Sequence, residues 1–226
     1  MPSTISVIIP TINEERSVGE VIGELPRSLK QKCEIIVVDS NSTDRTREVA
    51  RARGARVVVE NRRGYGRAFL SGANAAKGDI VVLIDGDGTY SLAELPAIIK
   101  PIVDGNADLV IGSRFDGKME RGSMPTINYL GNHLFVSITN LLFRTSVRDS
   151  HSGYRAISAS SLRSLKLQCK GMEYATEMVV RAAQKRLRIA SVPITYRRRS
   201  GSSKLHPFRD GARHMALILK LFLSRP

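Results

Sequence analysis

The sequence lacks several features that would narrow its function. Its two cysteines, Cys33 and Cys169, give neither a disulfide framework nor metal-ligand spacing, which favours two ordinary thiols in a reducing compartment. No apolar run approaches the ~20 residues that a membrane-spanning helix needs, and the N-terminus lacks a signal-peptide pattern. Trp is absent and aromatic residues make up 5% of the chain, so a nucleic-acid-binding surface of stacked rings is disfavoured.

Acidic residues are also scarce relative to basic ones. Thirty-five Lys and Arg stand against 21 Asp and Glu, which leaves a net charge of +14 and a pI near 10.3. Such a surface attracts nucleic acid, anionic lipid or phosphorylated substrates, and the charge alone does not choose among them. The hydrophobic content of 42% is ordinary for a globular protein, and 226 residues favour one domain or at most two small ones.

Two common nucleotide-binding motifs are missing. The chain has no Gly-x-x-x-x-Gly-Lys-Ser/Thr, which excludes a P-loop enzyme. The segment 61–67 precedes a predicted helix, but it lacks the third glycine of a dinucleotide loop and follows the third strand rather than the first. A Rossmann dehydrogenase is therefore disfavoured. Arg67 and nearby backbone amides remain candidates for a donor phosphate, with an ordinary turn as the alternative.

The first half of the chain alternates predicted strands and helices. The predicted strands are short, continuous apolar runs rich in Val and Ile, as expected for strands buried on both faces. They are Ile5–Ile9, Ile35–Val38, Val57–Val59, Ile80–Ile84 and Leu109–Ile111. The helix-compatible segments between them are Ser17–Ser28, Asp44–Arg53, Gly66–Ala76 and Leu95–Asp104. This order predicts an α/β fold with an open, mostly parallel sheet flanked by helices, whose ligands bind beyond the carboxyl ends of the strands.

The second half is less regular. We expect helices over Pro125–Phe143 and Tyr174–Arg186, a strand over Ile189–Tyr196 and a basic loop over Arg197–Lys204. Residues 206–226 read as an amphipathic tail helix with its apolar side chains near helical spacing. The expected organisation is one domain over 1–205, with a first half over about 1–115 and a second half over about 116–205, followed by this tail.

Asp85 and Asp87 follow the fourth predicted strand and are two residues apart, so their side chains leave the same face. Two carboxylates held that close repel each other unless a cation joins them. Oxygen ligands with room for phosphate oxygens suit Mg²⁺ or Mn²⁺, and Gly86 lets a diphosphate approach the backbone. The pair therefore predicts a metal and diphosphate site.

Polar segments also follow the first two predicted strands, over 10–15 and 39–44. Helix capping explains Ser42 or Asp44 as well as a functional role does. It explains Asp39 less well, because Asp39 directly ends an apolar run. In the second half, Asp149 is the best candidate for a general base if the acceptor is a hydroxyl. The alternative is a buried structural carboxylate that pairs with Arg155 or a backbone amide.

Six ordered motifs together resemble the family 2 inverting glycosyltransferases of GT-A fold, and the match covers nearly the whole chain. Four lie in the first half of the domain, about 1–115, which the resemblance implies binds the nucleotide sugar, and two lie in the second half, about 116–205, which it implies binds the acceptor. The last three resemble the polyprenyl-phosphate branch with its dolichyl-phosphate mannose and glucose synthases. Residues 85–90, together with 207–211, look most like the archaeal dolichyl-phosphate hexosyltransferases that start N-glycans. The motifs are residues 8–14, 37–44, 85–87, 112–115, 149–155 and 199–204.

The resemblance implies a role for each matching position. The nucleotide of the donor would be held by Pro10, Thr11, Glu14, Asp39, Arg67, Asp85 and Gly86, with Asp39 accepting a hydrogen bond from the base. The metal would be held by Asp85 and Asp87. The acceptor phosphate would face Ser113, Arg114, Arg199 and Lys204, and the expected catalytic residues are Asp87, Asp149, Arg199 and Lys204. Ser40 and Thr89 depart from the family pattern, which favours a UDP-sugar over GDP-mannose.

A lipid phosphate acceptor would need little general-base catalysis. The second pKa of a phosphate monoester is near 6, so its oxygen is already largely anionic at neutral pH. The enzyme must then bring two anions together, which calls for a divalent metal and Arg or Lys side chains.

We therefore expect metal-dependent transfer, with inversion, of a hexose or N-acetylhexosamine from a nucleotide sugar to dolichyl or polyprenyl phosphate for protein N-glycosylation. The protein would be cytoplasmic and bound to the inner face of the membrane, through its basic amphipathic tail or through a separate membrane subunit. The alternatives are a soluble sugar transferase or nucleotidyltransferase with a small phosphorylated or hydroxyl acceptor and, least favoured, a nucleic-acid-binding protein. No nucleic-acid partner is expected.

Overall fold

The fold is built on one seven-stranded sheet in the order β3-β2-β1-β4-β6-β5-β7. The structure is a computed structural model that describes residues 3–26, 29–199 and 207–224. β6 runs antiparallel to both of its neighbours, β4 and β5, and every other pair is parallel. The strands are β1 Ile5–Thr11, β2 Cys33–Asp39, β3 Arg56–Val59, β4 Ile80–Leu83, β5 Leu109–Met119, β6 Arg155–Ser158 and β7 Ile189–Tyr196.

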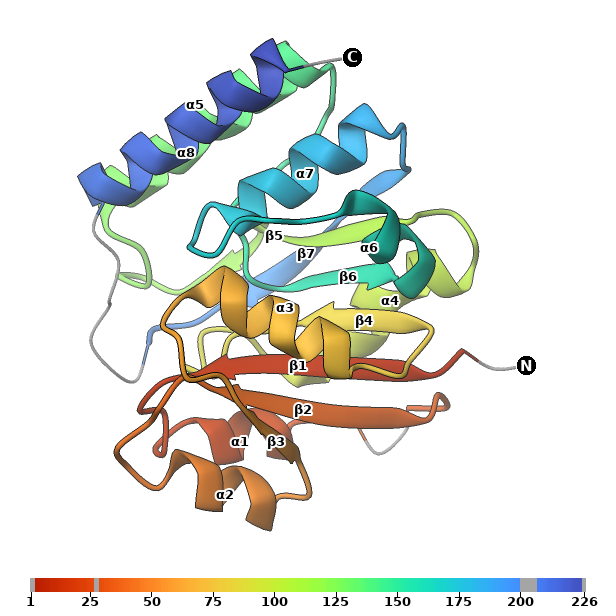
Figure 1. Cartoon of the computed structure of the whole chain (residues 1–226), viewed down its shortest axis with the longest axis vertical. Helices are drawn as coiled ribbons and strands as arrows, with labels where there is room; N and C mark the ends of the chain where they lie inside the picture. The colour runs from red at the N-terminus through yellow and green to blue at the C-terminus, as the bar shows by residue number, and fades with distance from the viewer. Residues whose placement is uncertain (1–2, 27–28, 200–206, 225–226) are drawn as a thin grey trace.

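Helices cover both faces of the sheet, as the alternating strand and helix pattern predicted (Figure 1). They are α1 Val18–Gly23, α2 Thr46–Ala52, α3 Tyr65–Ala75, the 3₁₀ turn η1 Leu92–Glu94, α4 Leu95–Val103, α5 Thr126–Phe143, α6 Ala159–Leu165, α7 Tyr174–Gln184 and α8 Pro207–Leu223. α1 ends at Gly23, five residues short of the predicted Ser28. Pro26 explains this early end, because proline disfavours helical geometry in the residue before it.

Alternate residues of the central strands point to opposite faces of the sheet, and each face builds its own core. In β1, Val7 and Ile9 pack with α1, α2 and α4, whereas Ile8 packs with α3, α6 and α7. This burial on both sides explains why the strand is apolar at successive positions. Residue 115 lies inside β5, so the two predicted halves of the chain share one sheet.

β6 was not predicted, and its direction matters for the site. It is four residues long and starts at Arg155, so it carries no long apolar run. Because β6 is antiparallel, its amino end lies at the edge of the sheet where β1, β4 and β5 have their carboxyl ends. The loop before β6, residues 149–154, is therefore delivered to the ligand-binding edge.

α5 and α8 pack against each other and against α7, away from the sheet (Figure 1). A third core forms there, in which Ile218 and Leu221 of α8 meet Phe143 of α5 and Val180 of α7. The apolar side of the tail helix, which the sequence suggested for membrane contact, is thus covered by protein. No helix in the described segments is long and apolar enough to cross a membrane.

Candidate functional site

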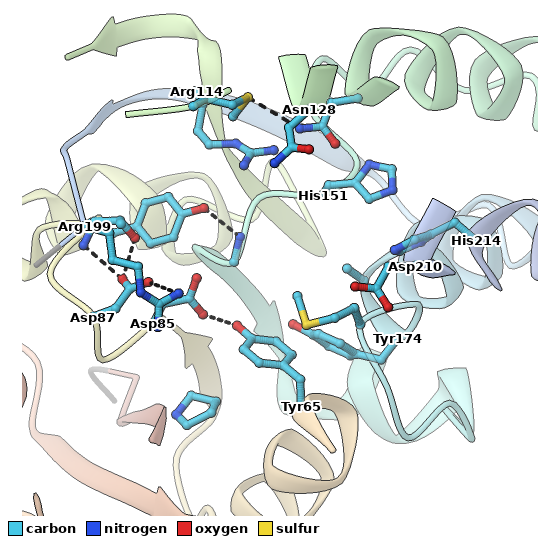
Figure 2. A pocket seen from close by; sticks show the side chains of 18 of the residues that line it. Tyr65, Asp85, Asp87, Arg114, Asn128, His151, Tyr174, Arg199, Asp210 and His214 are labelled. Atoms are coloured by element: carbon cyan, nitrogen blue, oxygen red, sulfur yellow. Dashed lines mark hydrogen bonds and ion pairs between the residues drawn. The ribbon is translucent and has the colours of Figure 1, made fainter. Parts of the chain in front are cut away.

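A cavity of about 840 Å³ lies at the edge of the sheet where the parallel strands end. One end is formed by the ends of β1 and β4, and the other by α5 and α8, which approach from outside the sheet. Figure 2 shows Asp85 and Asp87 on one side and Arg114, Asn128 and His151 on another. Residues from both halves of the sequence therefore meet in one space.

Asp85 lies two residues after β4, and its carboxylate is enclosed by Tyr65 and Gly153. The hydroxyl of Tyr65, at the start of α3, donates a hydrogen bond to its Oδ1 (Figure 2). Gly153 lies so close that a Cβ there would come within 2.5 Å of Oδ2. Burial and the neighbouring Asp87 carboxylate raise the pKa of Asp85 to about 7, and the bond from Tyr65 opposes this rise. A cation bound between the two carboxylates would relieve their mutual repulsion, so the pair favours cation binding.

Asp87 is held on both of its oxygens. The backbone N–H and the hydroxyl of Thr89 donate to Oδ1 at 3.0 and 2.6 Å. Nη1 of Arg199 lies 3.1 Å from Oδ2, and Nη2 of the same guanidinium donates to Glu14 Oε1 at 2.8 Å. Arg199 thus bridges the expected metal ligand and the expected nucleoside-binding loop after β1.

The corner expected to hold the nucleoside is formed by the ends of β1 and β2. Pro10 and Thr11 line the cavity, and Asp39 lies fully buried behind Ser40, which lines it. Oδ2 of Asp39 accepts the N–H of Ser42 at 3.1 Å. Its Oδ1 is buried and has no hydrogen-bond partner in the described part of the chain. An unsatisfied buried carboxylate oxygen is costly, so this position suits a ligand N–H donor.

Arg114, just beyond the buried part of β5, brings a positive charge to the cavity wall. Its Nε and Nη2 donate to the two oxygens of Asp149 at 2.6 and 2.9 Å, and both side chains are buried. Asp149 also accepts the N–H groups of His151 and Ser152, at 3.0 and 3.1 Å. Burial tends to raise the pKa of Asp149, but Arg114 and these donors hold it below its usual value. Burial of Arg114 tends to lower the pKa of its guanidinium, but the ion pair with Asp149 raises that pKa overall.

Asp149 is therefore a carboxylate that fixes Arg114, and it is not among the residues that line the cavity. The sequence left open a pairing with Arg155 or a backbone amide. The amide bonds are present, but the charged partner is Arg114 and not Arg155. The guanidinium of Arg155 donates to the backbone carbonyls of Ser150, Ser152 and Ala175. With both oxygens engaged and its pKa lowered, Asp149 is poorly suited to accept a proton from a hydroxyl acceptor.

Two histidines meet at the helical end of the cavity. The hydroxyl of Thr176 on α7 lies 2.8 Å from Nδ1 of His214 on α8 and 3.4 Å from Nε2 of His151. Phe135 of α5 packs on both rings, with centroids 5.4 and 5.8 Å away. Burial lowers the pKa of both imidazoles, so they are neutral at neutral pH. His151 lies within the motif 149–155, but His214 was not among the predicted site residues, and its spacing of four residues from Asp210 on one helix was the available signal.

The structure brings most of the predicted site residues to the cavity. The predicted residues that line it are Pro10, Thr11, Glu14, Asp85, Gly86, Asp87, Arg114 and Arg199. Those that do not are Asp39 and Asp149, described above, together with Ser113 and Arg67. Ser113 accepts the N–H of Asp116 at 3.2 Å and so shapes the backbone beside Arg114. Lys204 lies outside the described residues.

Arg67 belongs to a helix start that is closed by protein groups. The N–H groups of Gly66 and Arg67 donate to the carbonyls of Gly171 and Lys170, each at 3.2 Å. A Cβ at Gly66 would lie 2.4 Å from the carbonyl of Cys169, so glycine permits this close approach. These amides are therefore occupied, and Arg63 lines the cavity in place of Arg67.

The residues expected to bind a metal form a pair rather than a full shell. In the described ranges, no group of three or more His, Cys, Asp or Glu side chains could hold an ion. Asp85 and Asp87 supply carboxylates from one turn, and both line the cavity. Mg²⁺ and related ions are often held by one or two carboxylates together with substrate phosphates. The residues present fit that mode of binding.

Comparisons with known proteins agree with this geometry. The sequence profile described as Glycosyl transferase family 2 matches residues 6–166. The low-salt glycan biosynthesis hexosyltransferase Agl6 of Haloferax volcanii is 38% identical over 220 residues, 96% of this chain and 53% of that protein. The chain therefore spans about half the length of this relative. The dolichyl-phosphate hexose transferase of the same organism is 35% identical over 97% of this chain and 94% of its own length.

A solved structure shares the architecture. Glucosyl-3-phosphoglycerate synthase from Mycobacterium tuberculosis, in complex with Mn²⁺, UDP-glucose and phosphoglyceric acid, superposes with a TM-score of 0.79. The sequences are 26% identical, and the match covers 97% of this chain and 80% of the other. A GT-A sheet with a C-terminal helix, as the sequence predicted, is confirmed.

Proposed function

The chain belongs to glycosyl transferase family 2, and we propose that it transfers a hexose or N-acetylhexosamine from a nucleotide sugar to dolichyl or polyprenyl phosphate. One observation carries the choice of acceptor. A buried guanidinium, Arg114, is fixed on the cavity wall by Asp149, and Figure 2 shows it in the same cavity as Asp85 and Asp87. A fixed cation there favours an anionic nucleophile over a neutral hydroxyl.

The chemistry of such a transfer needs little from a base. An oxygen of the acceptor phosphate forms a bond to the anomeric carbon, and the bond from that carbon to the donor diphosphate breaks. The diphosphate leaves with the electron pair, and no proton has to be removed from an ionised acceptor. Arg114 offsets the repulsion between the two anions, and Arg199 lies on the donor side of the same space.

On the donor side, Asp85 and Asp87 would hold Mg²⁺ or Mn²⁺, which would neutralise charge on the leaving diphosphate. The unsatisfied Oδ1 of Asp39 would accept the N–H of the base. Uracil and guanine both offer a ring N–H to such an acceptor, so this contact alone does not choose the base, but the structural relative was solved with UDP-glucose. We therefore favour a UDP-sugar. Attack by the acceptor on the face opposite the diphosphate gives inversion at the anomeric carbon.

The relatives support a lipid acceptor. A dolichyl-phosphate hexose transferase is similar along nearly its whole length, and the Agl6 relative is described as acting in glycan biosynthesis. We propose that the product feeds glycan assembly, as protein N-glycosylation requires. The protein would then work at a membrane surface, where its long-chain acceptor resides.

The test is a transfer assay with the full chain, Mn²⁺, labelled UDP-glucose, UDP-N-acetylglucosamine or GDP-mannose, and a short polyprenyl phosphate in detergent. We expect organic-extractable label from a UDP-sugar. The label should be lost with chelator, restored by Mn²⁺ or Mg²⁺, and absent in Asp87→Asn. Asp104→Asn, which changes a half-exposed carboxylate in a surface ion pair with Lys100, is the matched control. Absence of lipid-linked label with every donor would refute the proposal.

A second candidate is transfer to a small phosphorylated acceptor. It is favoured by the likeness to glucosyl-3-phosphoglycerate synthase, whose complex contains phosphoglyceric acid. The same Arg114 would then bind the phosphate of a water-soluble acceptor. Label found on 3-phosphoglycerate but never on polyprenyl phosphate would select this candidate.

A further inference from the structure

The outer face of α5 is unusually apolar for a surface helix. Nine large hydrophobic side chains are exposed in the described residues, and seven of them lie on α5 and α8. Five belong to α5, where Leu130, Leu134 and Leu141 are 62, 58 and 79% exposed. Figure 1 shows α5 and α8 at the outside of the molecule, beyond α7. Singly scattered exposed leucines are normal, but a cluster of this kind marks an interaction surface.

Four of the five exposed apolar residues of α5 form one stripe, and Tyr129 lies on another side of the helix. At 100° per residue, Ile127, Leu130, Leu134 and Leu141 fall within about 60° of one another around the helix. The stripe runs from Ile127 to Leu141, which are 14 residues apart and so about 21 Å apart along the helix axis. The core-facing residues Val136 and Phe143 of α5 are buried, so the stripe is additional to the apolar face that the fold uses.

The charge around the stripe is predominantly positive, with Glu120 before the segment and Asp210 in the first turn of α8 as the acidic neighbours. Residues 121–148 contain three Arg and no Asp or Glu. Arg121 precedes α5, and Arg144 and Arg148 follow it, and all three are exposed. α8 adds the exposed Arg213 and Lys220 beside α5. An apolar stripe bordered by cations complements an anionic lipid surface, whereas two copies of this face would repel each other.

The stripe is continuous with the cavity. Asn128, Gly131, Asn132 and Phe135 of α5 line the cavity, and their mean direction lies about a third of a turn from the stripe. Ile127 belongs to both sets, since it lines the cavity and is half exposed. One helix therefore presents one side to the acceptor end of the cavity and the next side to solvent.

We propose that the outer face of α5, extended by Leu219 and Leu223 of α8, is the surface through which this protein lies on an anionic membrane. The choice of a bilayer as occupant rests on the proposed lipid acceptor. The exposed leucines enter the interface, and the flanking arginines meet lipid phosphates. The acceptor phosphate then reaches Arg114 along α5 while its chain stays in the bilayer. Membrane contact is thus made mainly by α5, in the middle of the chain, and the tail helix α8 mainly packs against the protein side of α5.

The test is flotation of the full chain with vesicles of phosphatidylcholine and phosphatidylglycerol in equal parts. We expect the wild type to float with these vesicles and to float poorly with pure phosphatidylcholine. Leu134→Gln with Leu141→Gln should lower vesicle binding more than tenfold, because two leucines no longer leave water. Val59→Gln with Val103→Gln changes exposed apolar residues on β3 and α4, away from α5, and should float like the wild type.

Sugar transfer to a short polyprenyl phosphate in detergent provides the second measurement, because it does not need a membrane. The α5 variant should keep this activity, since neither leucine lines the cavity. It should lose most transfer to a long-chain acceptor embedded in anionic vesicles.

Three results would overturn the inference. They are vesicle binding that the α5 variant retains, no binding by the wild type, or a wild-type dimer in sedimentation that this variant abolishes. Failure of the proposed function would look different, because the wild type would float normally but transfer no sugar to either lipid phosphate.

Discussion

Asp149→Asn tests whether Asp149 holds Arg114 in place or acts as a base. The carboxylate makes two bonds to the guanidinium at 2.6 and 2.9 Å, and neither partner is exposed to solvent. Removing one charge of such a pair leaves the other buried and uncompensated, which costs about 3–5 kcal/mol. With a urea m value of about 2 kcal/mol/M, a loss of about 4 kcal/mol lowers the unfolding midpoint by roughly 2 M.

The double variant sharpens the measurement. Arg114→Met with Asp149→Leu removes both charges, so it should cost clearly less free energy of unfolding than the two single changes added together. Sugar transfer should be lost in both single variants and in the double variant, because none of them presents the guanidinium correctly. Recovery of stability without recovery of activity is the expected pattern.

The pH dependence has a definite sign. The folded pKa of Asp149 lies below its unfolded value of about 3.9. The stabilisation is therefore fully present above the unfolded pKa and is lost as the pH falls through the folded pKa. At neutral pH the wild type should unfold at a higher urea concentration than Asp149→Asn. This difference should disappear only in acid, as the pH falls through the folded pKa of Asp149. If Asp149→Asn unfolds at the wild-type urea concentration and instead loses a pH-dependent step of catalysis, Asp149 is a base and the reasoning is wrong.

Three further predictions address single contacts. Tyr65→Phe removes a hydrogen bond that lowers the pKa of Asp85, so the Mn²⁺ concentration for half-maximal activity should rise roughly three- to tenfold, and an unchanged requirement would contradict this role. Asp39→Asn should weaken UDP binding in calorimetry by about tenfold or more, since a charged acceptor is lost, and equal affinity would exclude contact with the base. Gly72→Ala places a Cβ 2.5 Å from Ile8 and should cost about 1–3 kcal/mol in urea unfolding, whereas Gly131→Ala meets open space on a helix and should gain up to about 1 kcal/mol. Changes of the same sign would show that Gly72 is not a packing constraint.

The sequence was informative where a strand is buried on both faces. β2 and β4 each contain an uninterrupted apolar run, the run of β1 is broken only by Ser6, and a polar segment follows each strand at the carboxyl edge of the sheet. β5 was predicted to end at Ile111 but extends to Met119. Its outer part is held by pairing with β7, where Lys118 lies opposite Thr195. Pairing of this kind leaves no apolar signal in the sequence.

Contacts between distant residues could not be predicted in the same way. Asp149 was considered with Arg155, six residues later, but its partner is Arg114, 35 residues earlier. The antiparallel β6 brings these residues together, and its four residues begin with a charged side chain. The guanidinium of Arg155 can be buried because it donates hydrogen bonds to backbone carbonyls. Those carbonyls come together only in the folded chain, so the local sequence pattern does not reveal them.

The tail shows a different limit of sequence patterns. The apolar spacing in α8 correctly indicated an amphipathic helix, but amphipathicity does not say what covers the apolar side. α5 and α7 cover it, through contacts such as that of Ile218 with Phe143. The exposed stripe lies instead on α5, which is apolar on more than one side. Only the arrangement of the helices decides which side meets protein.

The antiparallel course of β6 also bears on how the chain can be synthesised and divided. β4 pairs with β1 on one side and with β6 on the other. Until residue 158 has left the ribosome, β4 therefore remains an open, apolar sheet edge, prone to pair with other chains. A fragment ending near residue 115 keeps that edge open and lacks Gly153 beside Asp85. Although the residues proposed to bind the nucleotide all lie between positions 10 and 86, the first half of the chain is not a module that can be excised or exchanged alone.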